Sequence, residues 1–215
     1  MRIIVLIKPG AELEESDACA VEHALRIARC RLDVQVRALT AGPPACLSPL
    51  RTALALGADD AVHVADTRTS PYDALALSRI LATTIQELGY DLVLCGAASD
   101  VPNLALLPPM VAARLGIPAH CHASHIDLDA IDSPKLISVT GYSAPLRYPP
   151  FPAIAEARQK LISTRTLHPK IDREPNPVIT VKTLCPRSNT IIEVDEDPHI
   201  AAVQLVDFLA ARRFI

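Results

Sequence analysis

The stretch RTALALGADDAVHV, residues 51–64, holds the end of a predicted helix, a stop and a predicted strand. Apolar residues recur at helical spacing through residues 47–56, and Gly57 is placed to end that helix, because glycine adopts the backbone conformation of a helix C-terminus at no steric cost. Residues 61–64 then indicate a short strand. A helix that leads directly into a strand is the repeating step of an α/β protein.

The same step recurs on both sides of this stretch. Residues 3–7 read IIVLI between Arg2 and Lys8, a continuous apolar run typical of a strand buried on both faces. The predicted elements here are strands at residues 2–8, 34–39, 61–64 and 91–95, a helix with Asp17 as its N-cap, and helices at residues 47–56, 71–88 and 107–115. Strand and helix thus alternate through residue 116, which predicts an α/β fold with a doubly wound, mostly parallel sheet and helices on both faces.

The chain changes character after Pro118. The predicted elements are strands at residues 119–127 and 136–140, a short helix at 154–160, an extended arm at 164–186 and a final amphipathic helix at 200–214. Residues 145–152 are rich in proline, which cannot donate to a β-ladder and therefore favours an ordered loop or an edge. We expect an α/β domain at residues 1–163 and a C-terminal arm with a terminal helix at residues 164–215.

Composition argues against several classes of function. The formal net charge of −3 gives no electrostatic reason to expect nucleic acid or an acidic membrane as a partner. With 3% aromatic residues and no Trp, a stacking platform for single-stranded nucleic acid is not expected. The apolar run at residues 3–7 is too short for a signal peptide or a membrane span, so we expect a cytoplasmic chain whose six Cys are reduced thiols.

Ligands are expected at three loops. In open parallel sheets they bind beyond the carboxyl ends of the strands, where the strand order reverses. Residues 9–16, 40–44 and 96–109 fall there. The chain has neither the G-x-G-x-x-G dinucleotide fingerprint nor a P-loop, and Gly42 alone is more typical of a turn than of a phosphate site.

A histidine cluster offers one alternative reading, as a metal enzyme. The sequence HCHASH occupies residues 120–125. On a regular strand His120 and His122 share one face and His125 lies on the other, so only two ligands converge. Incidental surface imidazoles are therefore favoured over a metal site.

A hydrolytic site is a second alternative. Ser99 and Asp100, with Asp73, offer a hydroxyl and carboxylates for nucleophilic catalysis. No G-x-S-x-G elbow supports that reading, and Ser99 is equally suited to cap a turn. We expect neither catalytic residues nor a metal in this chain.

The proline-rich loop offers a binding role. Phe151 lies between Pro150 and Pro152, and an apolar ring on a stiff backbone suits a partner anchor, because prolines lower the entropy lost on binding. A loop packed on its own domain is the alternative, and composition alone does not decide between them.

Three segments resemble motifs of the electron transfer flavoprotein β subunit family, and they occur in the family's order. AVEHALRI at residues 20–27 resembles the family's first helix, A-[VL]-E-E-A-[LV]-R-L. Residues 51–64 are very close to R-x-A-L-A-M-G-A-D-R-[AG]-[IV]-x-V, and RYPPFPAIAEARQK at residues 147–160 is similar to R-Y-x-x-L-P-x-I-M-K-A-[KR]-K-K. The similarity covers nearly the whole chain, which is identified as a divergent member of this family.

The resemblance implies an electron carrier rather than an enzyme, with the adenine-nucleotide α-hydrolase-like fold. It implies a heterodimer with an α-type subunit that holds most of the redox FAD, and electron flow from a flavin dehydrogenase toward a quinone-linked acceptor. The family's β subunit also binds an adenine nucleotide, AMP or a second FAD. By resemblance the cofactor-binding positions are Leu6, Ser16, Ala41, Gly96, Asp100, Asn103 and Leu107, and the docking positions are Arg147, Tyr148, Phe151, Pro152 and Ile154.

The sequence departs from the family at the cofactor positions. The hairpin after the first strand is missing, and Ser16 stands where the family places an aromatic residue near the partner's flavin. The family's loop G-K-Q-A-I-D-D-D-x-N-Q-T-G-Q-M is replaced by GAASDVPNLALLPPM at residues 96–110, where Pro108 and Pro109 lack backbone donors. We predict that this loop does not hold AMP or FAD in the family manner. A binding or assembly module that kept the fold but lost redox duty is the alternative function.

Overall fold

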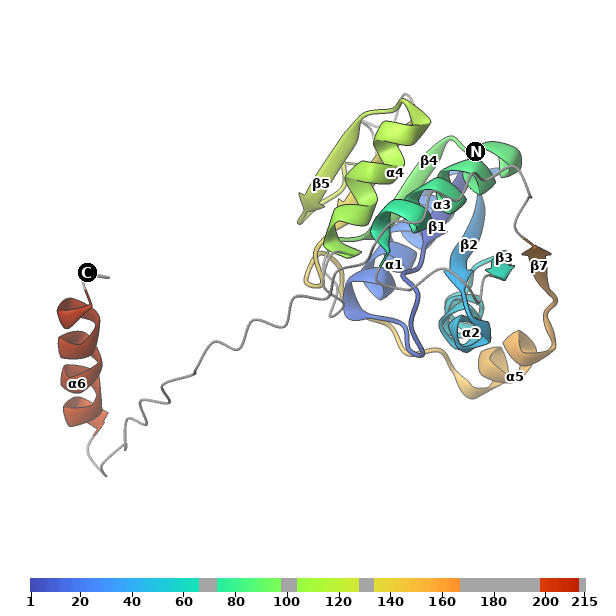
Figure 1. Cartoon of the computed structure of the whole chain (residues 1–215). Helices are drawn as coiled ribbons and strands as arrows, with labels where there is room; N and C mark the ends of the chain where they lie inside the picture. Colours follow the sequence, from blue (N-terminus) through green and yellow to red (C-terminus); the bar gives the residue numbers. More distant parts are fainter. Residues whose placement is uncertain (66–72, 98–103, 128–133, 167–197, 213–215) are drawn as a thin grey trace. The chain divides into compact units, whose positions relative to one another are not determined.

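The computed structural model describes residues 1–65, 73–97, 104–127, 134–166 and 198–212, and the fold is given for these residues. Within them seven strands form one sheet, and every neighbouring pair of strands is parallel. Figure 1 shows β5 (Ala119–Ala123) and β7 (Ile162–Thr166) at opposite ends of this sheet. The predicted doubly wound α/β fold is confirmed.

From β1 to α4 strands and helices alternate, as the sequence predicts. The other strands are β1 (Arg2–Leu6), β2 (Gln35–Gly42), β3 (Asp60–Ala65), β4 (Leu92–Gly96) and β6 (Lys135–Val139). The α-helices are α1 (Glu15–Cys30), α2 (Leu47–Leu56), α3 (Ala74–Leu88), α4 (Leu107–Leu115), α5 (Phe151–Gln159) and α6 (Pro198–Ala211). Two short 3-10 helices, η1 (Pro44–Cys46) and η2 (Leu104–Leu106), precede α2 and α4.

The strand order fixes where a ligand site belongs. The order is β5-β6-β4-β1-β2-β3-β7, so the chain moves outward from β1 through β2 and β3 and then returns to pair β4 with the other side of β1. The reversal of direction between β1 and β4 is the topological switch point of the sheet. The residues that follow these two strands are therefore the first candidates for a site.

β1 shows why both faces of the sheet are covered. Ile3, Val5 and Ile7 belong to one buried core that includes residues of α1 and α2, whereas Ile4 and Leu6 belong to a second core with residues of α3 and α4. Successive side chains of a strand point to opposite faces, so a strand between two helical layers needs an unbroken apolar run. The IIVLI run of the sequence satisfies this requirement.

Two glycines end helices as predicted. Gly57 follows α2 with a φ of 127°, and Gly89 follows α3 with a φ of 69°. Both values lie in the region that residues with a side chain rarely adopt, so glycine is required at these positions. At its other end α3 is capped by Asp73, whose side chain accepts a hydrogen bond from the Ala76 N–H at 2.9 Å. The predicted start of this helix, Pro71, lies outside the described residues.

Two predicted helix starts are wrong. α1 begins at Glu15 and its N-cap residue is Glu14, so Asp17 lies in the first turn and is not the cap. α5 begins at Phe151 rather than at residue 154. Pro152 is accommodated because the N–H groups of the first helical turn have no acceptor within the helix.

The two edge strands also differ from expectation. β5 ends at Ala123 and does not continue to residue 127, and its register shifts between His120 and Ala123. β7 pairs with β3, so the segment predicted as an extended arm from residue 164 begins inside a strand of the sheet. Residues 167–197 lie outside the described part of the chain.

α6 is described by itself. Contacts divide the chain into two compact units, Met1–Val178 and Ile179–Ile215, and α6 belongs to the second. Its side chains at Ile200, Val203, Leu205 and Val206 are exposed. No helix among the described residues has both the length and the apolar character that a membrane crossing requires. The domain border between residues 163 and 164 stays a prediction.

Candidate functional site

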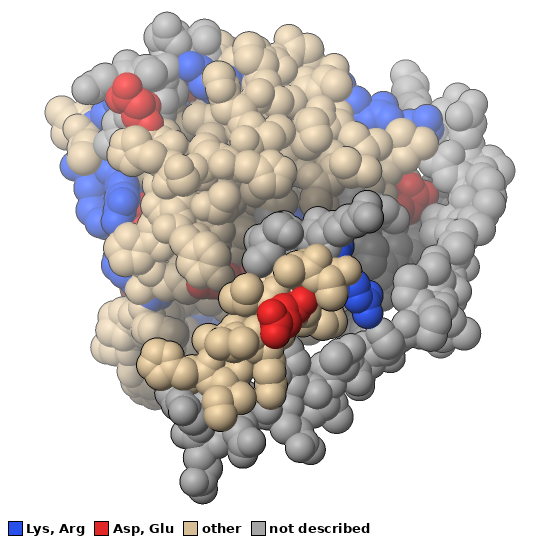
Figure 2. Space-filling model, turned by 90° about the vertical axis from the view of Figure 1, so that its left-hand side faces the viewer, with Lys and Arg blue, Asp and Glu red and all other residues tan. Residues whose placement is uncertain are grey.

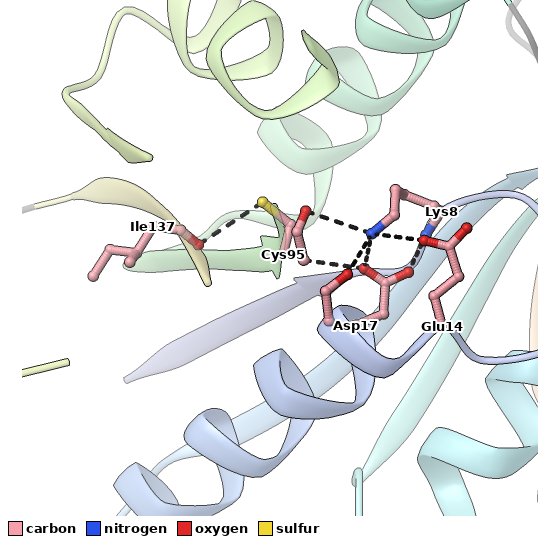
Figure 3. A network of polar contacts seen from close by, with 7 residues as sticks. Lys8, Glu14, Asp17, Cys95 and Ile137 are labelled. Atoms are coloured by element: carbon pink, nitrogen blue, oxygen red, sulfur yellow. Dashed lines mark hydrogen bonds and ion pairs between the residues drawn. The ribbon is translucent and has the colours of Figure 1, made fainter. Parts of the chain in front are cut away.

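A buried network of polar side chains lies at the switch point, where β1 and β4 end (Figure 3). Lys8 follows β1, Gly96 is the last residue of β4, and Asp17 projects from the first turn of α1. Figure 3 shows the side chains of Lys8, Asp17 and Glu14 directed toward one another beside the end of β4. Two consecutive elements, β1 and α1, therefore meet the end of β4, which is distant from them in the sequence.

Asp17 joins the ends of both strands to α1. Its Oδ2 accepts a hydrogen bond from the backbone N–H of Lys8 at 2.9 Å, and its Oδ1 accepts one from the backbone N–H of Gly96 at 3.0 Å. Oδ1 also lies 2.5 Å from Nζ of Lys8. The Asp17 side chain is only 1% exposed, so its carboxylate is held entirely by donors of this chain.

Lys8 is equally enclosed. Its side chain is 3% exposed, and its Nζ lies 3.4 Å from Oε2 of Glu14 as well as close to Asp17. Oγ of Ser16 at 3.3 Å and the carbonyl of Gly96 at 3.4 Å complete the surroundings of the ammonium group. The ammonium group of Lys8 thus faces two carboxylates.

Gly96 is needed here because the network approaches its backbone closely. A Cβ added at Gly96 would lie 2.3 Å from Oγ of Ser16, 2.5 Å from Oδ1 of Asp17 and 2.6 Å from Nζ of Lys8. A Cβ atom does not approach a non-bonded atom this closely, so a side chain at this position would displace the network. Glycine at the end of β4 is thus explained by space rather than by a special φ angle.

Cys95, the neighbour of Gly96, is not suited to be a nucleophile. Burial raises the pKa of the Cys95 thiol far above its usual range, and the negative charge of Asp17 raises it further. The Sγ faces the carbonyl of Ile137 at 3.8 Å. Since the thiolate is the reactive form, Cys95 behaves as an inert buried thiol.

The end of β2 is held by a buried histidine. The Nε2 of His63 donates to the carbonyl of Gly42 at 2.9 Å, and Gly42 has a φ of 150°. A Cβ at Gly42 would lie 2.9 Å from Sγ of Cys46. In the described part of the chain, Nδ1 of His63 and Oγ1 of Thr40, its register partner on β2, have no hydrogen-bond partner. The backbone at Gly42 is therefore closely packed, and its carbonyl is held in place by His63.

The predicted cofactor positions divide into three groups. Ser16 and Gly96 meet in the switch-point network. Leu6, Ala41 and Leu107 are buried in the apolar core on the α3 and α4 side. Asp100 and Asn103 lie outside the described residues.

Two central residues of the network were not identified from the sequence. Lys8 reads as the end of a strand, and Asp17 reads as a helix cap. The one available signal is a lysine directly after a buried strand, followed by an acidic residue at the start of the next helix. A single sequence does not show that both turn inward, because Gly96, their third partner, is distant in the sequence.

The predicted docking segment is fixed to α1 by Glu22. The Glu22 side chain is 6% exposed, and its carboxylate pairs with Nε of Arg147, with Arg26 at 3.6 Å and with Arg29 at 3.1 Å. Cys19, one helical turn earlier, donates from Sγ to the carbonyl of Gly141 at 3.0 Å. Arg147, one of the predicted docking residues, is therefore engaged within the domain.

The aromatic rings of this segment point outward. Tyr148 is 91% exposed and Phe151 is 78% exposed, and Pro152 is exposed as well, whereas Ile154 is partly buried against the core. Arg51 of α2 donates to the carbonyls of Ala157 and Lys160 and so fixes the far end of α5. Exposed apolar rings are thus held on an anchored backbone.

The histidine cluster does not form a regular strand face. His122 has a φ of 60° and its N–H donates to Oγ of Ser138 at 3.0 Å, within the register shift of β5. His120 and His125 line a pocket of about 210 Å³ that also includes Asp127 and Lys135. Within the described residues, no three His, Cys, Asp or Glu side chains gather in a way that could hold a metal ion.

Charged side chains are scattered on the face shown in Figure 2. Lys and Arg form separate groups there, and most of the described surface carries neither charge. This agrees with the mild net charge of −3.

Comparison with known proteins agrees with the family that the three sequence motifs resemble. Residues 3–140 match the family model described as "Electron transfer flavoprotein domain". An electron transfer flavoprotein subunit beta of Clostridium acetobutylicum is 32% identical over 126 residues, which cover 58% of this chain and 48% of the relative. The acryloyl-CoA reductase electron transfer subunit gamma of Anaerotignum propionicum is 34% identical over 112 residues, covering 51% of this chain and 42% of the relative.

The length of the match varies between relatives. In the two comparisons above, the chain spans less than half of the relative's length. An electron transfer flavoprotein subunit beta of Mycobacterium bovis is 28% identical over 234 residues, covering 95% of this chain and 88% of the relative.

Proposed function

The chain belongs to the electron transfer flavoprotein family as a β-subunit-type member, and from that membership we propose that it pairs with an α-type subunit as a carrier of electrons. In this proposal the partner holds most of the redox FAD. The pair takes electrons from a flavin dehydrogenase and passes them toward a quinone-linked acceptor. The match of residues 3–140 to the family is the observation that carries the proposal.

Docking of the dehydrogenase is assigned to the segment around α5. Tyr148 and Phe151 expose large apolar rings, and the backbone that carries them is anchored through Arg147 to α1 and through Arg51 to α2. Buried aromatic anchors dominate the binding energy of protein interfaces. An anchored backbone also lowers the entropy lost on binding. Arg147 acts in this proposal by positioning the segment.

The Ser16 position supports a second candidate function. Ser16 is buried, and its hydroxyl lies beside Nζ of Lys8. Its side chain is thus enclosed within the domain. This favours an assembly module that keeps the family fold and the docking surface without contributing to redox chemistry.

We place both candidates in the cytoplasm. Cys19, Cys46 and Cys95 are buried free thiols, and Cys30 and Cys121 are exposed free thiols. Exposed unpaired thiols suit a reducing compartment.

Coexpression with an α-type subunit separates the two candidates. The electron-carrier proposal expects a stable complex with the absorption spectrum of bound flavin, which bleaches on reduction. A stable but colourless complex would support the assembly module. Failure to form any complex would contradict both.

A further inference from the structure

We propose that Asp17 supplies the anion at the switch point, so that this chain folds and functions with no nucleotide bound there. The resemblance to the family implies an adenine nucleotide in the β subunit, and the switch point is where an open α/β sheet binds one. The residues that the structure describes at this point do not fit such a ligand. This inference is independent of whether the chain carries electrons.

The backbone donors that a phosphate would use are already engaged. Phosphates bind to free N–H groups at the ends of strands and the starts of helices. At the switch point the N–H groups of Lys8 and Gly96 both donate to the carboxylate of Asp17, at 2.9 and 3.0 Å. Asp17 therefore holds the position and the hydrogen bonds of an anionic ligand.

The charge at this point also opposes a phosphate. Nζ of Lys8, the cation that would attract one, lies 2.5 Å from Oδ1 of Asp17 and 3.4 Å from Oε2 of Glu14. A nucleotide phosphate placed beside Lys8 would meet two carboxylates in a site shielded from water. Like charges disfavour each other strongly where solvent screening is weak.

The start of α4 lacks the features of a phosphate site as well. Pro108 and Pro109 both lie in the first turn of this helix. Neither proline has a backbone N–H to offer. Leu107 and Leu104 are buried in the core on this side of the sheet. Close approach of a phosphate to this helix end is thus not supported.

The direct test is the nucleotide content of the purified full chain. The protein is denatured, and released adenine nucleotides are separated by chromatography; separately, the melting temperature is measured with and without millimolar AMP. We expect no nucleotide above background and no change in melting temperature. A stoichiometric nucleotide, or a rise of several degrees with AMP, would overturn the proposal. Because the chain is tested without a partner, the result does not depend on the electron-carrier proposal.

A chemical rescue tests the role of Asp17 itself. Asp17→Ala removes the carboxylate and leaves a space of about the size of formate beside the N–H groups of Lys8 and Gly96. We expect sodium formate to raise the melting temperature of Asp17→Ala by at least about 3 °C more than sodium chloride of equal ionic strength does. The wild type should show no such difference.

Asp60→Ala is the matched control. This variant also loses a paired carboxylate, because Asp60 accepts hydrogen bonds from Arg37. Asp60 lies at the start of β3, away from the switch point. Formate should not rescue this variant. Equal responses of the two variants, or none in Asp17→Ala, would overturn the assignment of Asp17 as the internal anion.

Failure of Asp17→Ala to fold leaves the test intact. The variant is then refolded from urea in formate and in chloride. A larger yield of folded protein in formate is the expected result, and equal yields would contradict the proposal.

Discussion

Nζ of Lys8 lies 2.5 Å from Oδ1 of Asp17, and both side chains are withdrawn from solvent at the point where the sheet changes direction. The same carboxylate accepts the backbone N–H groups that follow β1 and end β4. A place that open α/β sheets use for ligands is here occupied by the protein's own charges.

The two members of this pair should differ in their effect on stability. Lys8→Met leaves Asp17 with two backbone hydrogen bonds, whereas Asp17→Ala leaves two N–H groups without an acceptor as well as a buried cation. Breaking a buried ion pair lowers the free energy of unfolding by about 3–5 kcal/mol, and unpaired buried donors add to the loss. We expect Asp17→Ala to be the less stable variant in urea unfolding; the reverse order would contradict this account.

Gly96→Ala should be strongly destabilising. The added Cβ would lie within 2.6 Å of three polar atoms of Ser16, Asp17 and Lys8, so the network must shift or break. We expect a loss of about 2 kcal/mol or more in the free energy of unfolding. Gly10→Ala is the control, because the nearest atom to its Cβ is the carbonyl oxygen of Glu12 at 3.6 Å. Similar unfolding midpoints for the two variants would count against the network.

Phe151→Ala should weaken docking without unfolding the domain. The ring is 78% exposed, so its loss should leave the unfolding midpoint unchanged, whereas loss of an interface anchor lowers affinity by about tenfold or more. The affinity is measured by titration against the purified dehydrogenase partner. Leu32→Ala, which removes another exposed apolar side chain, is the control and should bind like the wild type. Unchanged affinity for Phe151→Ala would remove α5 from the docking surface.

His23 should make the fold sensitive to acid. Burial lowers the pKa of His23 below its ordinary value of 6.5, and the charges of Arg26 and His125 lower it further, whereas the Ser143 backbone and the charge of Glu22 oppose the shift. The unfolded chain then binds a proton that the folded chain does not, so stability falls as the pH drops below about 6.5 toward the lowered folded pKa. Melting temperatures at pH 7.5 and 5.5 check this: His23→Gln should lose less stability over this interval than the wild type.

The sequence predicted the fold because its signals were local. The IIVLI run of β1 and the glycines at 57 and 89 each determine the structure of a few neighbouring residues. Local signals of this kind along the chain predict the alternation of strands and helices. A parallel sheet follows from that alternation, since connected parallel strands need a crossover between them.

The switch-point network was missed because it depends on distant partners. Asp17 has the right position and chemistry for a helix cap, and only its contact with the N–H of Gly96, 79 residues away, shows another role. β5 likewise ends at Ala123 rather than at residue 127, and it is irregular before its end, with a φ of 60° at His122 and a register shift between His120 and Ala123. Phe151 was assigned to a loop because proline signals outweighed the helical pattern, although the first turn of a helix accepts proline.

The cofactor content of the complex distinguishes an electron carrier from an assembly module and shows whether the switch point holds a nucleotide. The chain is coexpressed with an α-type subunit, the complex is purified and denatured, and released FAD and adenine nucleotide are counted against protein. We expect a heterodimer that releases FAD in stoichiometric amount and no AMP. A heterodimer that releases no flavin would contradict the electron-carrier function, and one that releases stoichiometric AMP would contradict the filled switch point.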